Sequence, residues 1–128
     1  MNRNLIFRIG LPLVFFFFIL WIIILADSAN YNFAFFVVGT VPYGDKIAHA
    51  TLYGMMALFL NFGLGFKTKK FLGFDMQIGA ILVLLFAGLE ELSQYYFPSR
   101  TLDIYDFVAD FIGIVLASFI TIPHQTTP

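Results

Sequence analysis

Residues 90–110 read EELSQYYFPSRTLDIYDFVAD and decide how the rest of the chain is interpreted. This stretch holds five of the eight acidic residues and one of the seven basic residues, and it lies between two long apolar runs. Ionisable side chains next to lipid are costly, so they usually face the interior of a helix bundle or a water-filled cavity. The stretch therefore predicts a polar site at one face of a bundle of membrane helices.

The composition indicates that lipid surrounds most of the chain. Apolar residues make up 60% of the 128 residues and charged residues 12%, whereas an ordinary soluble domain carries about 25% charged residues. A soluble domain of this size could not bury so many apolar side chains, because small domains keep much of their surface exposed. The net charge of −1 provides no basic surface for nucleic acid. The absence of cysteine excludes disulfides, zinc-thiolate sites and thiol catalysis.

The apolar runs are each close to the roughly 20 residues that cross a bilayer as a helix. The first run follows Arg3 and Arg8 and so also resembles a secretion signal. Its apolar core is longer than the roughly 7–15 residues of such a signal, so we expect a retained helix. We predict an all-α membrane protein, a single domain over residues 1–128 with a bundle of four transmembrane helices. The helices are expected at about residues 5–26, 46–66, 75–95 and 103–122.

Polar residues between the runs suggest loops and helix caps. Residues 27–44 are expected to form a loop, and residues 67–70 (KTKK) a short basic loop. Asp45 and Asp75 stand at the predicted starts of two helices, where aspartate is a favoured N-cap. Asn61 is interpreted as a polar group that helps to pack the helices.

Small residues suggest where helices approach closely. Gly113 and Ala117 are four residues apart, a spacing that places two small side chains on one helix face. Gly79 is expected to form a similar contact with Gly63 or Gly65. These positions predict that a neighbouring helix packs closely against the fourth predicted helix, and that another packs against the third at Gly79.

Lysine and arginine near the helix ends predict the orientation, because cytoplasmic loops of membrane proteins are enriched in both. Five such residues fall on one side of the predicted bundle and two on the other, which places both termini in the cytoplasm and the acidic stretch outside. All six tyrosines fall on that outer side, as an interfacial belt would. The five are Arg3, Arg8, Lys67, Lys69 and Lys70, and the two are Lys46 and Arg100.

Polar residues recur on one face in each of three predicted helices. Asp45, His49 and Tyr53 follow each other at intervals of four, and three aspartates starting at Asp103 are spaced i, i+3 and i+7. Gln94 lies four residues after one glutamate and three after the next. These faces can meet at one level of the bundle. The predicted site contains Asp45, Lys46, His49, Tyr53, Glu90, Glu91, Gln94, Arg100, Asp103, Asp106 and Asp110.

Several chemistries fit this set of residues. The acids can pair with Lys46, His49 or Arg100 and merely orient the helices. A histidine with carboxylates can bind a divalent metal, but no spacing here is diagnostic, so no residue is assigned as a metal ligand and the cofactor stays open. His49 and Glu91 can act as acid and base. Arg100 can hold a phosphate or carboxylate through two hydrogen bonds.

Two motifs resemble those of the VanZ-like family. Residues 45–53 (DKIAHATLY) match its D-K-x-x-H-x-x-x-Y pattern, and residues 90–113 resemble its [DE]-E-x-x-Q…P-x-R…D-x-x-D-x-x-x-N-x-x-G block. Together they extend the resemblance over about residues 43–117. The chain differs at Asp110, where the family usually has asparagine, and at Glu90, where aspartate is common.

The resemblance implies a small multi-pass protein of the bacterial cytoplasmic (inner) membrane with a role at the cell envelope. The founder of the family is associated with resistance to the glycopeptide teicoplanin, a property that the resemblance does not transfer to this chain. We expect the site to recognise a polar or anionic envelope molecule, a lipid head group or a cell-wall precursor, with Arg100 holding the anion. Alternatives are a membrane-embedded enzyme that uses Glu91 or His49 on a lipid-linked substrate, a proton-coupled transporter, and a structural or assembly protein. The expected partners are membrane lipid and such a ligand, without nucleic acid.

Overall fold

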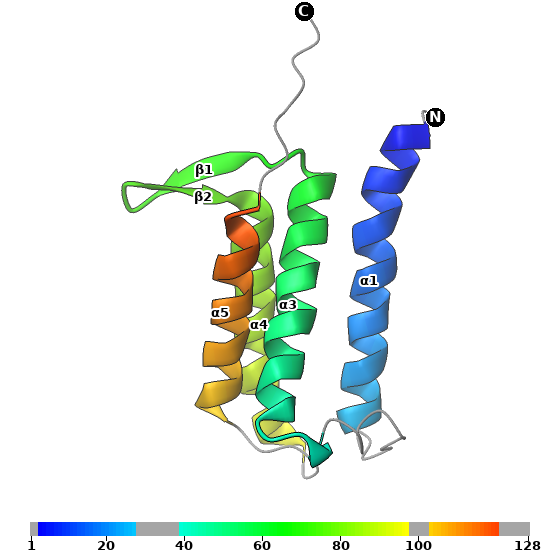
Figure 1. Cartoon of the computed structure of the whole chain (residues 1–128), viewed down its shortest axis with the longest axis vertical. Coiled ribbons are helices and arrows are strands. Elements are labelled where there is room, and N and C mark those ends of the chain that lie inside the picture. Colours follow the sequence, from blue (N-terminus) through cyan, green and yellow to red (C-terminus); the bar gives the residue numbers. More distant parts are fainter. Residues whose placement is uncertain (1–2, 28–38, 98–102, 121–128) are drawn as a thin grey trace, which may run out of the picture.

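The computed structural model describes residues 3–27, 39–97 and 103–120, and this part of the chain is mostly helical. Long helices run alongside one another, with α3 lying between α1 and the pair formed by α4 and α5 (Figure 1). A short antiparallel hairpin connects α3 to α4, and a turn of 3-10 helix extends α4. The elements are α1 (Arg3–Asp27), α3 (Gly44–Gly63), β1 (Thr68–Phe71), β2 (Phe74–Gln77), α4 (Ile78–Ser93), η1 (Gln94–Tyr96) and α5 (Ile104–Ser118).

Two helical segments in the described part of the chain are long and apolar enough to cross a membrane. They are Arg3–Leu25 within α1 and Ile78–Tyr96, which joins α4 to η1. Little of the first segment is buried inside the protein, and large apolar side chains such as Phe17 and Trp21 point outward from it. The predicted helical character is therefore confirmed, and two segments have the length and composition of spans.

The closest helix pair is α3 with α5, and small residues make it possible. A Cβ atom at Gly113 would overlap the backbone of Ala50, and one at Gly54 would lie 2.9 Å from the carbonyl oxygen of Gly113. Ala117 is also buried, one turn further along α5. Close approach through Gly113 and Ala117, as the sequence predicted, is confirmed.

A buried amide pair joins α3 to the start of α4. The Asn61 amide nitrogen donates to the Gln77 side-chain oxygen, and the Asn61 oxygen accepts from the backbone N–H of Ala80 at 3.0 Å. Asn61 therefore packs helices, as predicted. The predicted pairing of Gly79 with Gly63 or Gly65 is wrong, because Gly79 lies directly against Asn61.

The hairpin corrects the predicted start of the third helix. Asp75 pairs with Lys70 across β1 and β2 and does not cap a helix, so α4 begins at Ile78 rather than near residue 75. Residues 68–70, expected in the basic loop, belong to β1 (Thr68–Phe71). The physical reason is the turn between the strands, where Leu72 and Gly73 both have positive φ and reverse the chain.

The remaining boundaries differ from prediction by a few residues. Asp45 is not the N-cap of α3, because that position is taken by Tyr43, whose left-handed backbone starts the helix without a side-chain hydrogen bond. Helix α3 ends at Gly63 rather than Phe66, and α5 ends at Ser118. Residues 28–38 of the predicted loop and residues 121–128 lie outside the described residues.

Replacing Gly113 by alanine should separate α3 from α5. The added methyl group would meet the backbone of Ala50, which cannot move aside as a side chain can, so we expect a loss of about 1–3 kcal/mol of stability. Gly10→Ala is the matched control, because nothing lies within 4 Å of the added atom and alanine favours a helix. Circular dichroism, recorded during thermal unfolding in detergent, gives the melting temperatures of the two variants. Equal melting temperatures would contradict the close packing of α3 against α5.

Candidate functional site

The polar residues gather at the end of the bundle where α3 and α5 begin and α4 ends (Figure 1). This end lies opposite the hairpin. The alternating helix directions bring together three segments that are far apart in the sequence: residues 45–53, 90–94 and 103–110. The meeting of the three polar faces, which the sequence predicted, is a consequence of that alternation.

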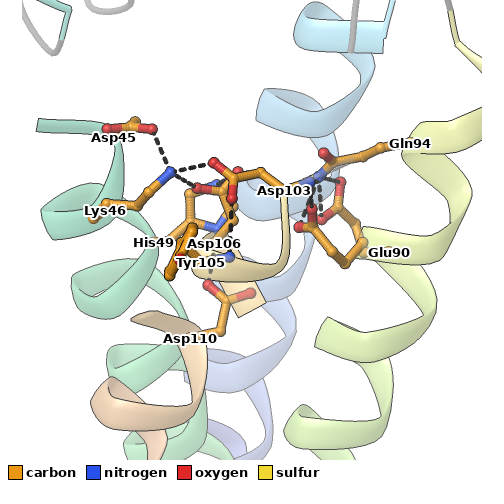
Figure 2. Close-up of polar contacts among 10 residues, drawn as sticks. Asp45, Lys46, His49, Glu90, Gln94, Asp103, Tyr105, Asp106 and Asp110 are labelled. Carbon is orange, nitrogen blue, oxygen red and sulfur yellow. Dashed lines mark hydrogen bonds and ion pairs between the residues drawn. The ribbon is translucent and has the colours of Figure 1, made fainter. Parts of the chain in front are cut away.

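Lys46 is the centre of the outer part of the site (Figure 2). Its Nζ atom lies 2.9 Å from Asp45 Oδ2, 2.7 Å from Asp103 Oδ2 and 2.5 Å from Asp106 Oδ1. These three carboxylates are close enough together, within 4.8 Å, to ligate a metal ion, and the lysine ammonium takes the place between them. Lys46 thereby ties the first turn of α3 to the start of α5.

His49 lies one turn deeper and contacts two aspartates (Figure 2). Its Nδ1 atom is 2.8 Å from Asp110 Oδ1, and its Nε2 atom is 3.8 Å from Asp106 Oδ2. The imidazole stacks on Tyr53, with ring centroids 6.0 Å apart. A proton on Nδ1 is donated to Asp110, and a proton on Nε2 would point towards Asp106. The histidine and the two aspartates form one connected group.

Asp110 is the most deeply buried acid of the site. Its exposed fraction is 0%, and its Oδ2 atom has no hydrogen-bond partner among the described residues. Buried carboxylate oxygens are normally hydrogen-bonded, since leaving one without a donor costs free energy. This oxygen therefore calls for a proton, a water molecule or a donor group of a ligand.

Glu90 and Glu91 are both buried and both contact Gln94, and Figure 2 shows the contact of Gln94 with Glu90. The amide nitrogen of Gln94 lies 3.1 and 3.2 Å from the two Glu90 oxygens and 3.2 Å from Glu91 Oε2. Glu91 Oε1 also accepts the backbone N–H of Asp103 at 2.9 Å. Both glutamates therefore face the interior of the bundle, and Glu91 fastens the end of α4 to the start of α5.

Asp103 is the N-cap of α5. Its Oδ1 atom accepts the backbone N–H of Tyr105 at 2.9 Å, while its Oδ2 atom contacts Lys46. The hydrogen bond from Lys46, followed by that from Tyr105, holds the pKa of Asp103 below its ordinary value. Asp103 is therefore ionised in the folded protein at neutral pH.

Ten of the eleven predicted site residues lie together, and Arg100 falls within residues 98–102, outside the described residues. The contact of Tyr53 with Phe86 of α4, whose ring centroids lie 6.2 Å apart, was not predicted. No signal in the sequence separates Phe86 from the other apolar residues of its helix.

The described part of the site is rich in acid. It contains six carboxyl groups against one lysine and one histidine, and the lysine already contacts three carboxylates. Such a surface attracts hydrogen-bond donors and positive charge, and it repels anions unless a further basic group contributes.

Comparison of the chain with protein-family models, with curated proteins and with solved structures finds no match. The geometry of the site and the motifs are therefore the basis for a functional proposal.

Replacing Lys46 by methionine should destabilise the protein at neutral pH. Three carboxylates would then lose the ammonium group between them, and because the cluster is partly screened by solvent we expect a melting temperature lower by only a few degrees. Because the pKa of Asp103 is lowered in the folded protein, the lysine contact stabilises fully above about pH 4, the ordinary pKa of an aspartate. Its contribution is lost as the pH falls through the lowered value.

The melting temperatures of the wild type and Lys46→Met should therefore converge below about pH 4. Lys70→Met in detergent is the control, because it removes the same charge from an exposed strand position. If the difference in melting temperature between the wild type and Lys46→Met stays constant down to low pH, the destabilisation does not come from the lost ion pairs.

Proposed function

We propose that this chain is a four-span, VanZ-like envelope protein of the bacterial cytoplasmic membrane that binds a polar envelope molecule, a lipid head group or a cell-wall precursor, at its outer end. The observation that carries the proposal is the buried oxygen of Asp110, which has no donor among the described residues. It lies beside His49, in a site whose carboxyl groups exceed its basic groups. A ligand with hydroxyl, amide or ammonium groups supplies the donors that such a site needs.

The chemistry of the site favours donor groups of the ligand as the principal contacts. Lys46 cannot serve as an anion-binding residue without giving up three carboxylates, and breaking a partly buried ion pair leaves charges unpaired. Arg100 remains the proposed clamp for a phosphate or carboxylate of the same molecule. The ligand would then present its hydroxyl or amino groups to Asp110 and Glu90, and its anionic group to Arg100.

The arrangement of the bundle supports the orientation of this site. The N-terminal end of α1, the C-terminal end of α5 and the hairpin lie at one end of the molecule (Figure 1). Arg3, Arg8 and the lysines of the hairpin are at that end, which the positive-inside rule places in the cytoplasm. The acidic site then faces the outside, at the level of the lipid head groups.

Single cysteines test the orientation, because the chain has none of its own. Tyr95→Cys places a thiol on exposed η1 beside the site, and Lys70→Cys places one on the exposed hairpin. In intact cells, a membrane-impermeant maleimide should label Tyr95→Cys and should label Lys70→Cys only after permeabilisation. Labelling of both variants in intact cells, or the reverse pattern, would reject the proposed topology.

Native mass spectrometry of the protein purified in mild detergent tests ligand binding. The wild type should retain a polar envelope molecule. In Asp110→Asn the affinity for that molecule should fall about tenfold or more, which corresponds to the loss of one strong hydrogen bond to a charged group. Asparagine keeps an acceptor for His49 and replaces the buried Oδ2 by a donor, so the variant should still fold. Asp75→Asn, on the exposed hairpin, is the matched control. Wild-type protein without a bound molecule would reject the recognition proposal.

The hydrogen-bonded pair of His49 and Asp110 favours a second candidate, an enzyme acting on a lipid-linked substrate. The buried carboxylate of Asp110 holds Nδ1 and orients the ring, so that Nε2, 3.8 Å from Asp106 Oδ2, is the nitrogen that would act as a base. His49 is the better candidate base, since Glu91 already accepts the N–H of Asp103. In that case His49→Gln should abolish conversion of extracted envelope lipids while Glu91→Gln reduces it less. No conversion by the wild type would reject this candidate.

A further inference from the structure

The hairpin at the opposite end of the molecule has two unlike faces. The register pairs Lys69 with Met76 and Phe71 with Phe74, and alternate residues of a strand point to the same face. One face therefore carries Phe71, Phe74 and Met76 together with the stem of Lys69. The other face carries Thr68, Lys70, Asp75 and Gln77. This amphipathic division does not serve the bundle core, because both strands are exposed except near the last residues of β2.

Apolar side chains are concentrated at the tip of the hairpin. Phe71 is 57% exposed, Leu72 is 84% exposed and Phe74 is 73% exposed. Leu72 has a φ of 53° and Gly73 a φ of 84°, the signs that a two-residue type I′ turn requires. Glycine, asparagine and aspartate are the usual residues in such a turn, and a leucine there is uncommon. The turn thus displays a large apolar side chain at the point farthest along both strands.

Basic side chains flank this tip. Lys67, Lys69 and Lys70 are all exposed, and Asp75 is the one acidic residue of the hairpin. Lysines beside a membrane are attracted to anionic head groups, and their long stems let the charge reach the phosphates while the carbon chain stays against apolar surface.

The hairpin projects sideways from the bundle, across the direction of the helices (Figure 1). It leaves from the end at which α3 finishes and α4 begins, so if the helices cross the bilayer it runs along the membrane surface. The tip is thereby carried away from the other helices and towards the surrounding lipid.

We propose that the tip of the hairpin, residues Phe71–Phe74, inserts into the head-group layer of the cytoplasmic leaflet, with Lys67, Lys69 and Lys70 bound to anionic lipid phosphates. The inference rests on the proposed crossing of the membrane by the helices, and it adds a lipid-binding element at the end opposite the polar site. It anchors the α3–α4 connection at the cytoplasmic surface and would fix the depth of α4, whose other end carries Glu90 and Glu91.

A lipid surface suits this element better than a second protein chain. The strands are four residues long, and short edges with lysine are poor templates for pairing with another strand. The three lysines are attracted to anionic lipid. A second copy of the hairpin would carry the same three lysines, and the two copies would repel each other.

Tryptophan fluorescence in vesicles tests the proposal, because the chain has a single tryptophan, Trp21. In a Trp21→Phe background, Phe74→Trp reports the tip and Thr68→Trp, on the opposite face near the base, is the control. With vesicles containing phosphatidylglycerol, brominated lipid should quench Phe74→Trp at least about twofold more than Thr68→Trp, as expected for an apolar ring below the head groups. Adding Lys69→Gln and Lys70→Gln to the Phe74→Trp protein should reduce its quenching by brominated lipid. Replacing the anionic vesicles by pure phosphatidylcholine vesicles should reduce it as well.

The remaining outcomes separate this inference from the proposed function. Native Trp21, half-exposed on α1, should be quenched by brominated lipid if the helices cross the membrane. If Trp21 is quenched but Phe74→Trp is quenched only by iodide, the hairpin lies in water and the inference is overturned while the membrane bundle stands. If neither quencher reaches Phe74→Trp, protein covers the tip and the inference is overturned in favour of a partner or a second copy. If Trp21 itself is not quenched, the proposed membrane bundle fails as well.

Discussion

The backbone contact between Gly113 and Ala50 is the constraint on which the site depends. Because Gly113 has no side chain, α5 lies directly against α3 at the residue that follows His49. Asp110 is one turn before Gly113, and so it reaches the imidazole at 2.8 Å. A wider separation of the two helices would leave Asp110 buried without this partner, at a considerable cost in free energy. The small residues in the middle of the helices thus set the geometry of the polar groups at their ends.

The charges at the end of the bundle where α3 and α5 begin form two linked groups. Lys46 joins the start of α3 to α5, while Glu91 joins the end of α4 to the backbone of Asp103. All three helices are therefore connected through the first turn of α5. The buried oxygen of Asp110 is the acceptor for which the described residues provide no donor.

The two ends of the molecule differ in chemistry. One end gathers carboxyl groups around a single lysine, and the other carries lysines around an exposed apolar turn. This polarity suits a protein with a binding site at one membrane surface and an attachment to anionic lipid at the other. The opposite placement follows from the antiparallel helices, since consecutive connections fall at alternate ends (Figure 1).

The sequence by itself determined the helical character and the polar face of each helix, because helical spacing is a local property. It also indicated that Asp45, His49 and Asp110 would lie at one end, since apolar runs of similar length alternate in direction. Only the tertiary structure decided that Lys46 contacts three aspartates at once and that Glu91 accepts the N–H of Asp103, because these partners are up to 60 residues apart. It also decided that the residues after α3 pair as strands. The chain reverses at Leu72, which has a positive φ, and Asn61 contacts Gln77 immediately before α4 begins at Ile78. Local spacing says which way a side chain points, whereas the partner it meets depends on how closely the helices pack.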